Sequence, residues 1–190
     1  MTPPITAAAS CKLLLIGGSL RAGSSNTAAL ETARQLAPTG SNARVYTGLA
    51  DLPHFNPDLE LGALPESVAD LRAQLAWADA VLFSTPEYAG ALPGSFKNLL
   101  DWCVGEGLYR KPVGFINASP HAGGAEGSYA MLRVVLGYVN ADIVEAACVR
   151  VAVCRDSIAT DGTLRDAAAR SGVAKCIQAL IDHIMQRSPG

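Results

Sequence analysis

The residues best suited to chemistry lie in one short segment, Gly17–Thr27, which combines hydroxyl, amide and guanidinium groups. Within nine residues it carries Arg21, Asn26 and four hydroxyl side chains, namely Ser19, Ser24, Ser25 and Thr27. Donors of this kind suit a terminal phosphate, which presents several acceptor oxygens on one small group. A hydrogen bond to a charged group contributes roughly 1.5–3 kcal/mol, against about 0.3–1 kcal/mol for a helix dipole. We therefore expect this segment to bind a phosphate mainly through its side chains.

The spacing within this segment excludes two common phosphate-binding loops. No Gly-Lys-Ser/Thr closes it, so it is not the loop of nucleoside triphosphatases. The pattern Gly-x-Gly-x-x-Gly is also absent, so it is not the dinucleotide fingerprint. One alternative stays open, namely a solvated loop in which Ser25 or Asn26 only caps the following helix.

Two regular elements must position the segment. Before it, Lys12–Ile16 is an apolar run typical of a strand buried on both faces. From Thr27 onward, the three- and four-residue spacing of Leu30, Ala33 and Ala37 predicts a helix. The first N–H groups of a helix have no partner within it, and the helix dipole favours an anion there. A strand, a polar glycine loop and a helix therefore form a suitable phosphate site.

Two later loops are expected to face the same site. The ten residues Thr85–Gly94 follow an apolar strand and contain two prolines and two glycines, so they form a stiff wall beside which a flat ligand fits. Ser119–Gly124 follow another strand and end in a glycine pair. Ligands of open α/β sheets bind beyond the carboxyl ends of the strands, so all three loops should share one crevice. For the ten-residue loop, a rigid turn with Tyr88 packed outward remains the alternative.

Strand and helix patterns alternate along the whole chain. The expected strands are Lys12–Ile16, Ala43–Tyr46, Ala80–Ser84, Lys111–Ala118 and Cys148–Val153. This alternation predicts parallel strands joined by helical crossovers. The simplest closure is an α/β three-layer sandwich of flavodoxin-like type, with a five-stranded parallel sheet in the order 2-1-3-4-5. We expect residues 11–187 to form a single domain and residues 1–10 to be a flexible tail.

Composition excludes several classes of protein. The chain has 190 residues, a net charge of −2 and 49% hydrophobic residues, so it gives no electrostatic reason to expect nucleic acid as a partner. No apolar run approaches the roughly 20 residues of a membrane helix, and the first ten residues do not resemble a secretory signal. The five cysteines are scattered, which indicates reduced thiols and a cytoplasmic setting. Cys103 and Cys154 are minor candidates for a catalytic thiol, and His54 has no companion at metal-ligand spacing.

Two motifs together carry a resemblance to a known family. They are Gly18-Ser19-Leu20-Arg21-x-x-Ser24-Ser25-Asn26 and Thr85-Pro86-Glu87-Tyr88-Ala89-Gly90-x-x-Pro93-Gly94-x-x-Lys97-Asn98-x-x-Asp101-Trp102. The chain resembles the NADPH-dependent FMN reductase family, which includes quinone, azo-dye and chromate reductases of flavodoxin-like fold. The resemblance covers residues 11–155. It implies an FMN-binding domain.

The resemblance also implies which residues bind the cofactor. Its phosphate site would consist of Ser19, Arg21, Ser25, Asn26 and Thr27. Its isoalloxazine loop would consist of Pro86, Glu87, Tyr88, Ala89 and Gly90. Ser119, Gly123 and Gly124 would border the pyrimidine end of the ring. Many members have Asn where this chain has Ala89, so a side-chain donor is missing there, and His121 is favoured as an exposed loop residue over a substrate contact.

The implied activity is transfer of two electrons from NADPH or NADH, through FMN, to a quinone, flavin or similar small acceptor. The flavin performs this chemistry, so we expect no catalytic residue of the protein itself and no metal. The alternatives are an electron-carrying flavodoxin and a flavin-binding sensor without turnover. Arg21, Arg110 and Lys111 are candidate partners of the NADPH 2′-phosphate. Family members are commonly homodimers or homotetramers, and Leu99-Leu100-Trp102 and Leu108-Tyr109 are candidate subunit contacts, although core packing explains most of them equally well.

Overall fold

The computed structural model describes residues 11–121 and 123–187, so the tail predicted at residues 1–10 lies outside the described residues. The described strands are β1 (Lys12–Gly17), β2 (Asn42–Tyr46), β3 (Ala80–Ser84), β4 (Pro112–Ser119) and β5 (Asp142–Ala152). The α helices are α1 (Ser25–Leu36), α2 (Glu66–Trp77), α3 (Gly94–Asp101), α4 (Glu126–Tyr138) and α5 (Ala167–Arg187). Short 3-10 helices are η1 (Gly48–Asp51), η2 (Pro57–Glu60) and η3 (Arg155–Ser157).

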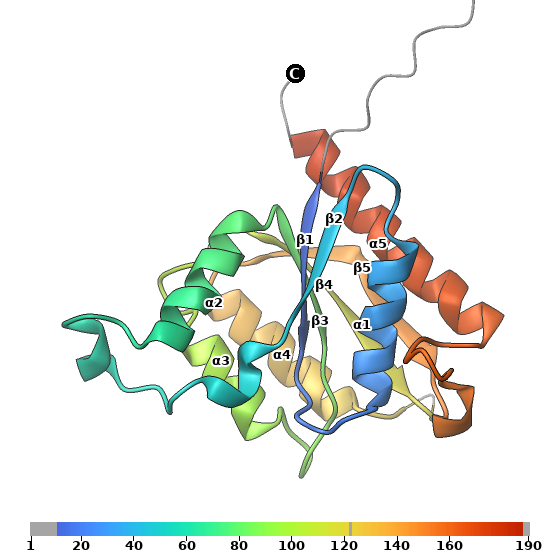
Figure 1. Ribbon diagram of the computed structural model, residues 1–190, viewed down its shortest axis with the longest axis horizontal. Coiled ribbons are helices and arrows are strands. Elements are labelled where there is room, and N and C mark those ends of the chain that lie inside the picture. Colours follow the sequence, from blue (N-terminus) through green and yellow to red (C-terminus); the bar gives the residue numbers. More distant parts are fainter. Residues whose placement is uncertain (1–10, 122, 188–190) are drawn as a thin grey trace, which may run out of the picture.

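The five strands form one parallel sheet in the order β2-β1-β3-β4-β5, which confirms the predicted fold class and strand order. All strands run the same way, so the loops that follow them gather at one edge, the lower edge in Figure 1. Strand β2 lies on one side of β1, whereas β3, β4 and β5 follow on its other side, so the order in which strands are added reverses at β1. This is the switch point at which open α/β sheets bind ligands.

Helices cover both faces of the sheet and give the three layers visible in Figure 1. On one face α1 and α5 pack on alternate strand residues such as Leu13, Leu15 and Leu82. On the other face α2, α3 and α4 pack on the intervening residues, such as Leu14 and Phe83. Strands covered on both faces must be apolar at every position, which explains the continuous apolar runs of β1 and β3.

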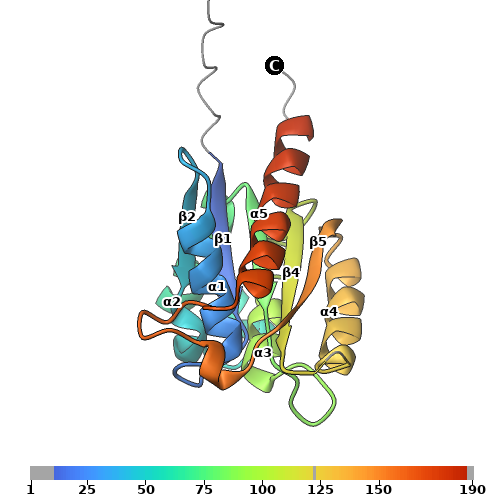
Figure 2. The ribbon, with the colours of Figure 1, turned by 90° about the vertical axis from the view of Figure 1, so that its right-hand side faces the viewer.

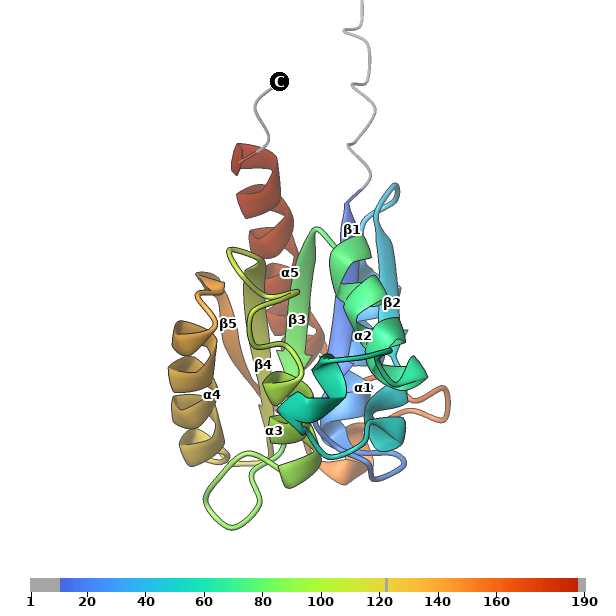
Figure 3. The same cartoon turned by 90° about the vertical axis from the view of Figure 1, so that its left-hand side faces the viewer.

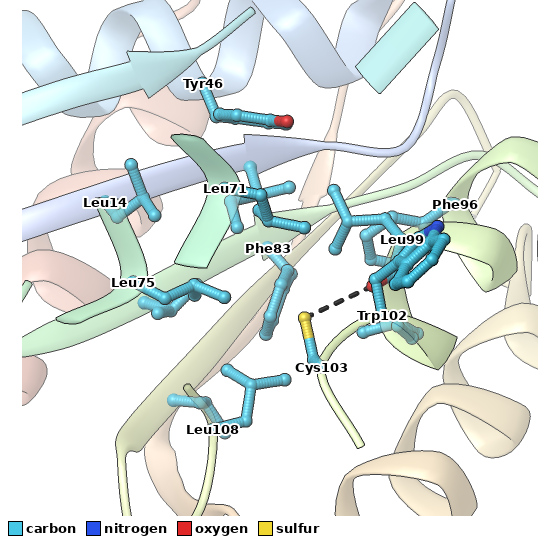
Figure 4. Close-up of a cluster of buried hydrophobic side chains, with 14 of the residues drawn as sticks. Leu14, Tyr46, Leu71, Leu75, Phe83, Phe96, Leu99, Trp102, Cys103 and Leu108 are labelled. Atoms are coloured by element: carbon cyan, nitrogen blue, oxygen red, sulfur yellow. Dashed lines mark hydrogen bonds between the residues drawn. The ribbon is translucent and has the colours of Figure 1, made fainter. Parts of the chain in front are cut away.

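The core between the sheet and helices α2 and α3 is built from large side chains, shown in Figure 4. Trp102 is fully buried, and its indole N–H donates to the Pro53 carbonyl oxygen over 2.9 Å. Cys103 lies in the same core, where its thiol donates to the Leu99 carbonyl oxygen over 3.2 Å. Burial raises the pKa of the Cys103 thiol to about 12, so it stays protonated at neutral pH. Cys103 is therefore a packing residue and not a nucleophile.

Core packing accounts for four of the five residues named as candidate subunit contacts. Leu99, Leu100, Trp102 and Leu108 are fully buried within the chain, so they are not available for a subunit contact. Of the residues considered for that role, only Tyr109 is exposed. Within residues 11–121 and 123–187, no helix combines the length and the apolar character that crossing a bilayer requires.

Candidate functional site

A crevice of about 540 Å³ opens at the carboxyl edge of the sheet, between the loops that follow β1, β3 and β4. Gly17 of β1 pairs with Ser84 of β3, so these two strands end at the same level. The residues that line the crevice are Ser19, Arg21, Ser24, Ser25, Asn26, Pro86, Glu87, Tyr88, Ala118, Ser119, Pro120, Ala125 and Arg155. The three loops predicted to face each other therefore do so.

The first turn of α1 borders the crevice. Its N-cap is Ser24, whose hydroxyl oxygen accepts the Thr27 N–H over 3.0 Å, rather than either of the caps considered from the sequence. The Thr27 hydroxyl lies 2.8 Å from Ser24 Oγ, and Thr27 lines a neighbouring hollow instead of the crevice. Because Ser24 caps α1, Ser25 and Asn26 are not required for that role.

Ser25 and Asn26 are held in place by the ends of two strands. The Ser25 hydroxyl donates to the Ala118 carbonyl oxygen over 3.3 Å, and the Ser84 hydroxyl lies 2.9 Å from the Asn26 amide oxygen. The Asn26 amide oxygen therefore already accepts a hydrogen bond within the protein, and the NH₂ group of Asn26 is the donor available to a ligand. These contacts fix the helix start against β3 and β4.

Arg21 is the cation of the first loop. Its backbone N–H donates to Ser19 Oγ over 3.2 Å, which tightens the turn, while the residue as a whole is exposed. Among the described residues, the Arg21 guanidinium has no carboxylate within ion-pair distance. A guanidinium on the crevice wall with no internal counter-charge is suited to an anionic ligand.

The loop after β3 carries a tight hairpin, seen as the lowest loop in Figures 2 and 3. Tyr88 and Ala91 exchange two backbone hydrogen bonds of 3.0 Å. The two residues between them both have positive φ, 51° at Ala89 and 73° at Gly90, as in the type I′ turn that favours Asn-Gly. The hairpin holds half-exposed Tyr88 against the crevice, whereas Ala89 and Gly90 form the tip and do not line it.

Ala89 stores strain that a glycine would release. A left-handed conformation costs an alanine about 1–2 kcal/mol, and the extra chain entropy of glycine offsets about half of that gain. We expect Ala89→Gly to raise the melting temperature by about 2 °C, measured by thermal unfolding. Ala130→Gly, in the exposed middle of α4, is the matched control and should lower the free energy of unfolding by about 1 kcal/mol. An equal loss of stability in both variants would contradict the strain at Ala89.

Glu87 joins the same loop to the start of α4. Its Oε2 atom accepts the Ser128 N–H over 3.0 Å, in the first turn of α4. The N-cap of α4 is Ala125, which has no side-chain oxygen to do this, so Glu87 supplies the cap from a distant loop. A carboxylate at a helix N-terminus is also favoured by the helix dipole.

Removing this cap should cost stability. We expect Glu87→Ala to lower the free energy of unfolding by about 1 kcal/mol, because a first-turn N–H loses its acceptor. Glu87→Gln keeps an amide oxygen at the same position and should lose less than half as much. Urea unfolding of the three proteins measures both values. A glutamine variant as unstable as the alanine variant would contradict a capping role.

The loop after β4 is closed by a glycine that no other residue can replace without movement. A Cβ at Gly124 would lie 1.8 Å from Ser119 Oγ, and the Gly124 carbonyl oxygen accepts from Asn117 Nδ2 over 2.9 Å. Gly123 has open space around it. Ser119 lines the crevice, whereas Gly123 and Gly124 shape the loop behind it without lining it. His121 in the same loop is exposed, as predicted.

Tyr129 of α4 supports the floor of the site. Its hydroxyl donates to the Ile116 carbonyl oxygen of β4 and accepts the Thr85 N–H over 3.3 Å. Burial raises the pKa of Tyr129, so the hydroxyl remains protonated and keeps both hydrogen bonds. The loop after β3 and strand β4 are thereby fixed to one helix.

Sequence reasoning missed one charged residue of the crevice. Arg155, in the first turn after β5, lines it together with Arg21. The signal was present, because Arg155 directly follows the carboxyl end of a strand, but only three of the loops at that edge were considered. Cys154 next to it is exposed and is not among the residues that line the crevice. Among the described residues, no three His, Cys, Asp or Glu side chains are grouped to hold a metal ion.

Known proteins match this chain over most of its length. The pattern of the family described as NADPH-dependent FMN reductase matches residues 11–153. The chain belongs to this family. It is 32% identical to the NAD(P)H-dependent FMN reductase PA1204 of Pseudomonas aeruginosa over 172 residues, which cover 89% of this chain and 92% of that relative. The sequence resemblance to the FMN reductases is thereby confirmed.

Quinone reductases are also among the relatives of this FMN reductase family member. The chain is 33% identical to the quinone reductase of Escherichia coli over 132 residues, which cover 67% of this chain and 70% of that relative. A solved structure, the flavoenzyme NAD(P)H:(acceptor) oxidoreductase FerB of Paracoccus denitrificans, superimposes with a TM-score of 0.82 at 29% identity. That match covers 93% of this chain and 98% of that one. Both similarities agree with the predicted flavodoxin-like fold.

Proposed function

We propose that this protein is an FMN-dependent NAD(P)H oxidoreductase that passes two electrons to a small acceptor such as a quinone or a flavin. One observation carries the proposal: phosphate donors at the start of α1 and a stiff wall of Pro86 and Tyr88 line the same crevice. Its volume of about 540 Å³ lies in the range of cofactor sites. Membership of the FMN reductase family supports the same activity.

The residues present fit FMN by their chemistry. The phosphate end would be held by Ser19, Arg21, Ser25 and the NH₂ group of Asn26, at the N-terminus of α1. Thr27 stays a prediction as a further phosphate ligand, since its hydroxyl pairs with Ser24. Pro86 and Tyr88 would border the ring, with Ser119 on the opposite side. Ala89, Gly90, Gly123 and Gly124 would act through the shape of their loops.

The chemistry of these groups indicates what the cofactor would supply and what the protein itself does. Bound FMN would supply the two-electron chemistry between nicotinamide and acceptor. The chain would bind and orient it: the start of α1 would anchor the phosphate, while the Glu87 and Tyr129 contacts hold the loop after β3 against α4. Glu87 has its carboxylate turned to the α4 N-terminus, so it is not positioned as a proton donor. We therefore assign no catalytic residue to the protein.

Steady-state kinetics test the proposal. The protein loaded with FMN should oxidise NADPH or NADH at a rate that rises with added quinone. An electron carrier or a flavin-binding sensor would bind FMN and give no acceptor-dependent oxidation, and that result would overturn the enzyme assignment. A protein that binds no FMN would also overturn the assignment of the crevice.

The positions of the three candidate arginine and lysine residues indicate which of them could distinguish NADPH from NADH. Arg110 and Lys111 precede β4, so they lie at the edge of the sheet opposite the crevice and are not placed to contact a nucleotide bound there. Of the three residues considered from the sequence, Arg21 is the one in the crevice. The ratio of the KM for NADPH to the KM for NADH, compared between the wild type and Arg21 variants, measures how much Arg21 contributes to this preference.

We also propose that the protein is a cytoplasmic homo-oligomer, either a dimer or a tetramer. The support for assembly is an apolar stripe on α4, where Met131, Val134 and Tyr138 are 40%, 59% and 85% exposed. All five cysteines are thiols, and three are buried, which suits a reducing compartment. Sedimentation of the purified protein would give the number of subunits.

A further inference from the structure

Arg155 reaches the crevice from a part of the chain beyond the family match, which ends at residue 153. It begins η3, the short helix that follows β5. In Figure 2 this segment runs in orange past the lower end of α1. Arg155 is thus a feature of this chain that the shared pattern does not include.

A series of hydrogen bonds fixes where Arg155 enters. The Val153 N–H donates to the Ser119 carbonyl oxygen over 3.1 Å, and the Ser25 hydroxyl donates to the adjacent Ala118 carbonyl oxygen. Further along, the Leu164 N–H donates to the Thr32 hydroxyl of α1 over 2.8 Å. The segment is therefore fastened to β4 on one side and to α1 on the other. This places Arg155 next to the start of α1, where Ser25 lies.

The charges of the crevice are unbalanced in favour of an anion. Arg21 and Arg155 both line it, and among the described residues neither makes an ion pair. Glu87, the one carboxylate among the described lining residues, accepts from the α4 N-terminus instead. A phosphate monoester carries a charge of about −1.5 to −2 at neutral pH, so one guanidinium balances only part of it.

We propose that Arg155 is a second guanidinium ligand of the flavin phosphate, acting with Arg21 from the other side of the α1 N-terminus. The inference rests on the proposed function, because it requires FMN in this crevice. It deepens that function by assigning the recognition of the phosphate to two arginines that are far apart in the sequence. FMN and riboflavin differ only in this phosphate, so their affinities isolate the contact.

The test compares the dissociation constants of FMN and riboflavin in Arg155→Ala and in the wild type, measured by flavin fluorescence titration. Loss of one hydrogen bond between charged groups should make the FMN dissociation constant of Arg155→Ala about 10-fold higher than that of the wild type. The riboflavin constant should not change. Arg155→Lys keeps the charge without the forked donor and should lose about 3-fold.

Arg165→Ala is the matched control, since Arg165 is an exposed arginine of the same connection that does not line the crevice. It removes the same charge and should leave both constants unchanged. Equal FMN affinity in Arg155→Ala and the control would overturn the inference, as would an equal loss for riboflavin. Unchanged FMN affinity with a higher KM for NADPH relative to NADH would overturn it in favour of the 2′-phosphate. A wild type that binds neither flavin would instead overturn the proposed function.

Discussion

Arg21→Ala is expected to raise the dissociation constant of FMN by about 10- to 100-fold while the protein stays folded. The guanidinium lies in the loop that precedes α1 and has no carboxylate partner among the residues that the structure describes, so its donors are available to the phosphate. A hydrogen bond between charged groups contributes about 1.5–3 kcal/mol, which corresponds to this range. The flavin content of the purified variant and a fluorescence titration measure the effect.

Two comparisons make this result specific. Arg21→Lys retains a positive charge but loses the planar, forked set of donors, so its FMN dissociation constant should lie between those of the wild type and the alanine variant. Because Arg21 is exposed, both variants should melt at the temperature of the wild type. Wild-type flavin content in Arg21→Ala would remove Arg21 from the phosphate site and leave the first loop without its main anion ligand.

Gly18→Ala is expected to damage both the fold and the site. A Cβ at Gly18 would lie 2.2 Å from Thr85 Oγ1 and 3.0 Å from the Phe96 ring, so the ends of β1 and β3 must move apart. The Gly18 N–H donates to the Ser84 carbonyl oxygen over 2.9 Å, and this bond would be strained as well. Forcing an atom into such packing costs about 1–3 kcal/mol. The movement also displaces the phosphate loop, so FMN affinity should fall with stability.

Urea unfolding and FMN titration of the Gly18 variant measure both losses. Gly62→Ala is the control, because a Cβ at Gly62 has nothing within 4 Å and the residue lies in an exposed loop. That variant should retain wild-type stability and affinity. If Gly18→Ala were as stable as Gly62→Ala, the close approach of β1 and β3 at this level would be wrong.

The sequence predicts the central strands well because burial on both faces leaves one clear signal. β3 has the predicted bounds, and each end of β1 and β4 lies within one residue of the prediction. Such strands read as unbroken apolar runs, whose length is also their structural length. The order of the strands then follows from parallel crossovers and the switch point.

The edge strand shows where this signal fails. β5 begins at Asp142, six residues before the predicted start, and its first half carries exposed Glu145 and Ala146. An edge strand with one open face tolerates polar residues, so its sequence does not stand out. A shift of register between Val113 and Phe115 of β4 interrupts the alternation further. Only the half after Cys148 retains a regular pattern.

The candidate site was predictable at the level of loops but not of every side chain. The rule that ligands lie beyond strand carboxyl ends places the three loops together. It does not say that Thr27 pairs with Ser24, that Ala89 and Gly90 form the hairpin tip, or that Glu87 caps α4. These outcomes depend on which donor finds which acceptor after packing. Arg155 was missed because the connection after β5 was not counted among the loops at this edge, although Arg155 lies just beyond the end of that strand.

The protein is proposed to bind FMN in this crevice, where the cofactor would supply electron transfer from a nicotinamide to a small acceptor. The most direct test of this claim follows the visible flavin band of the FMN-loaded protein under anaerobic conditions. Addition of NADPH or NADH should bleach the band, and a subsequent addition of quinone should restore it. A band that persists in excess NADPH and NADH would contradict the claim, because the protein would then bind flavin without using it as a reductase.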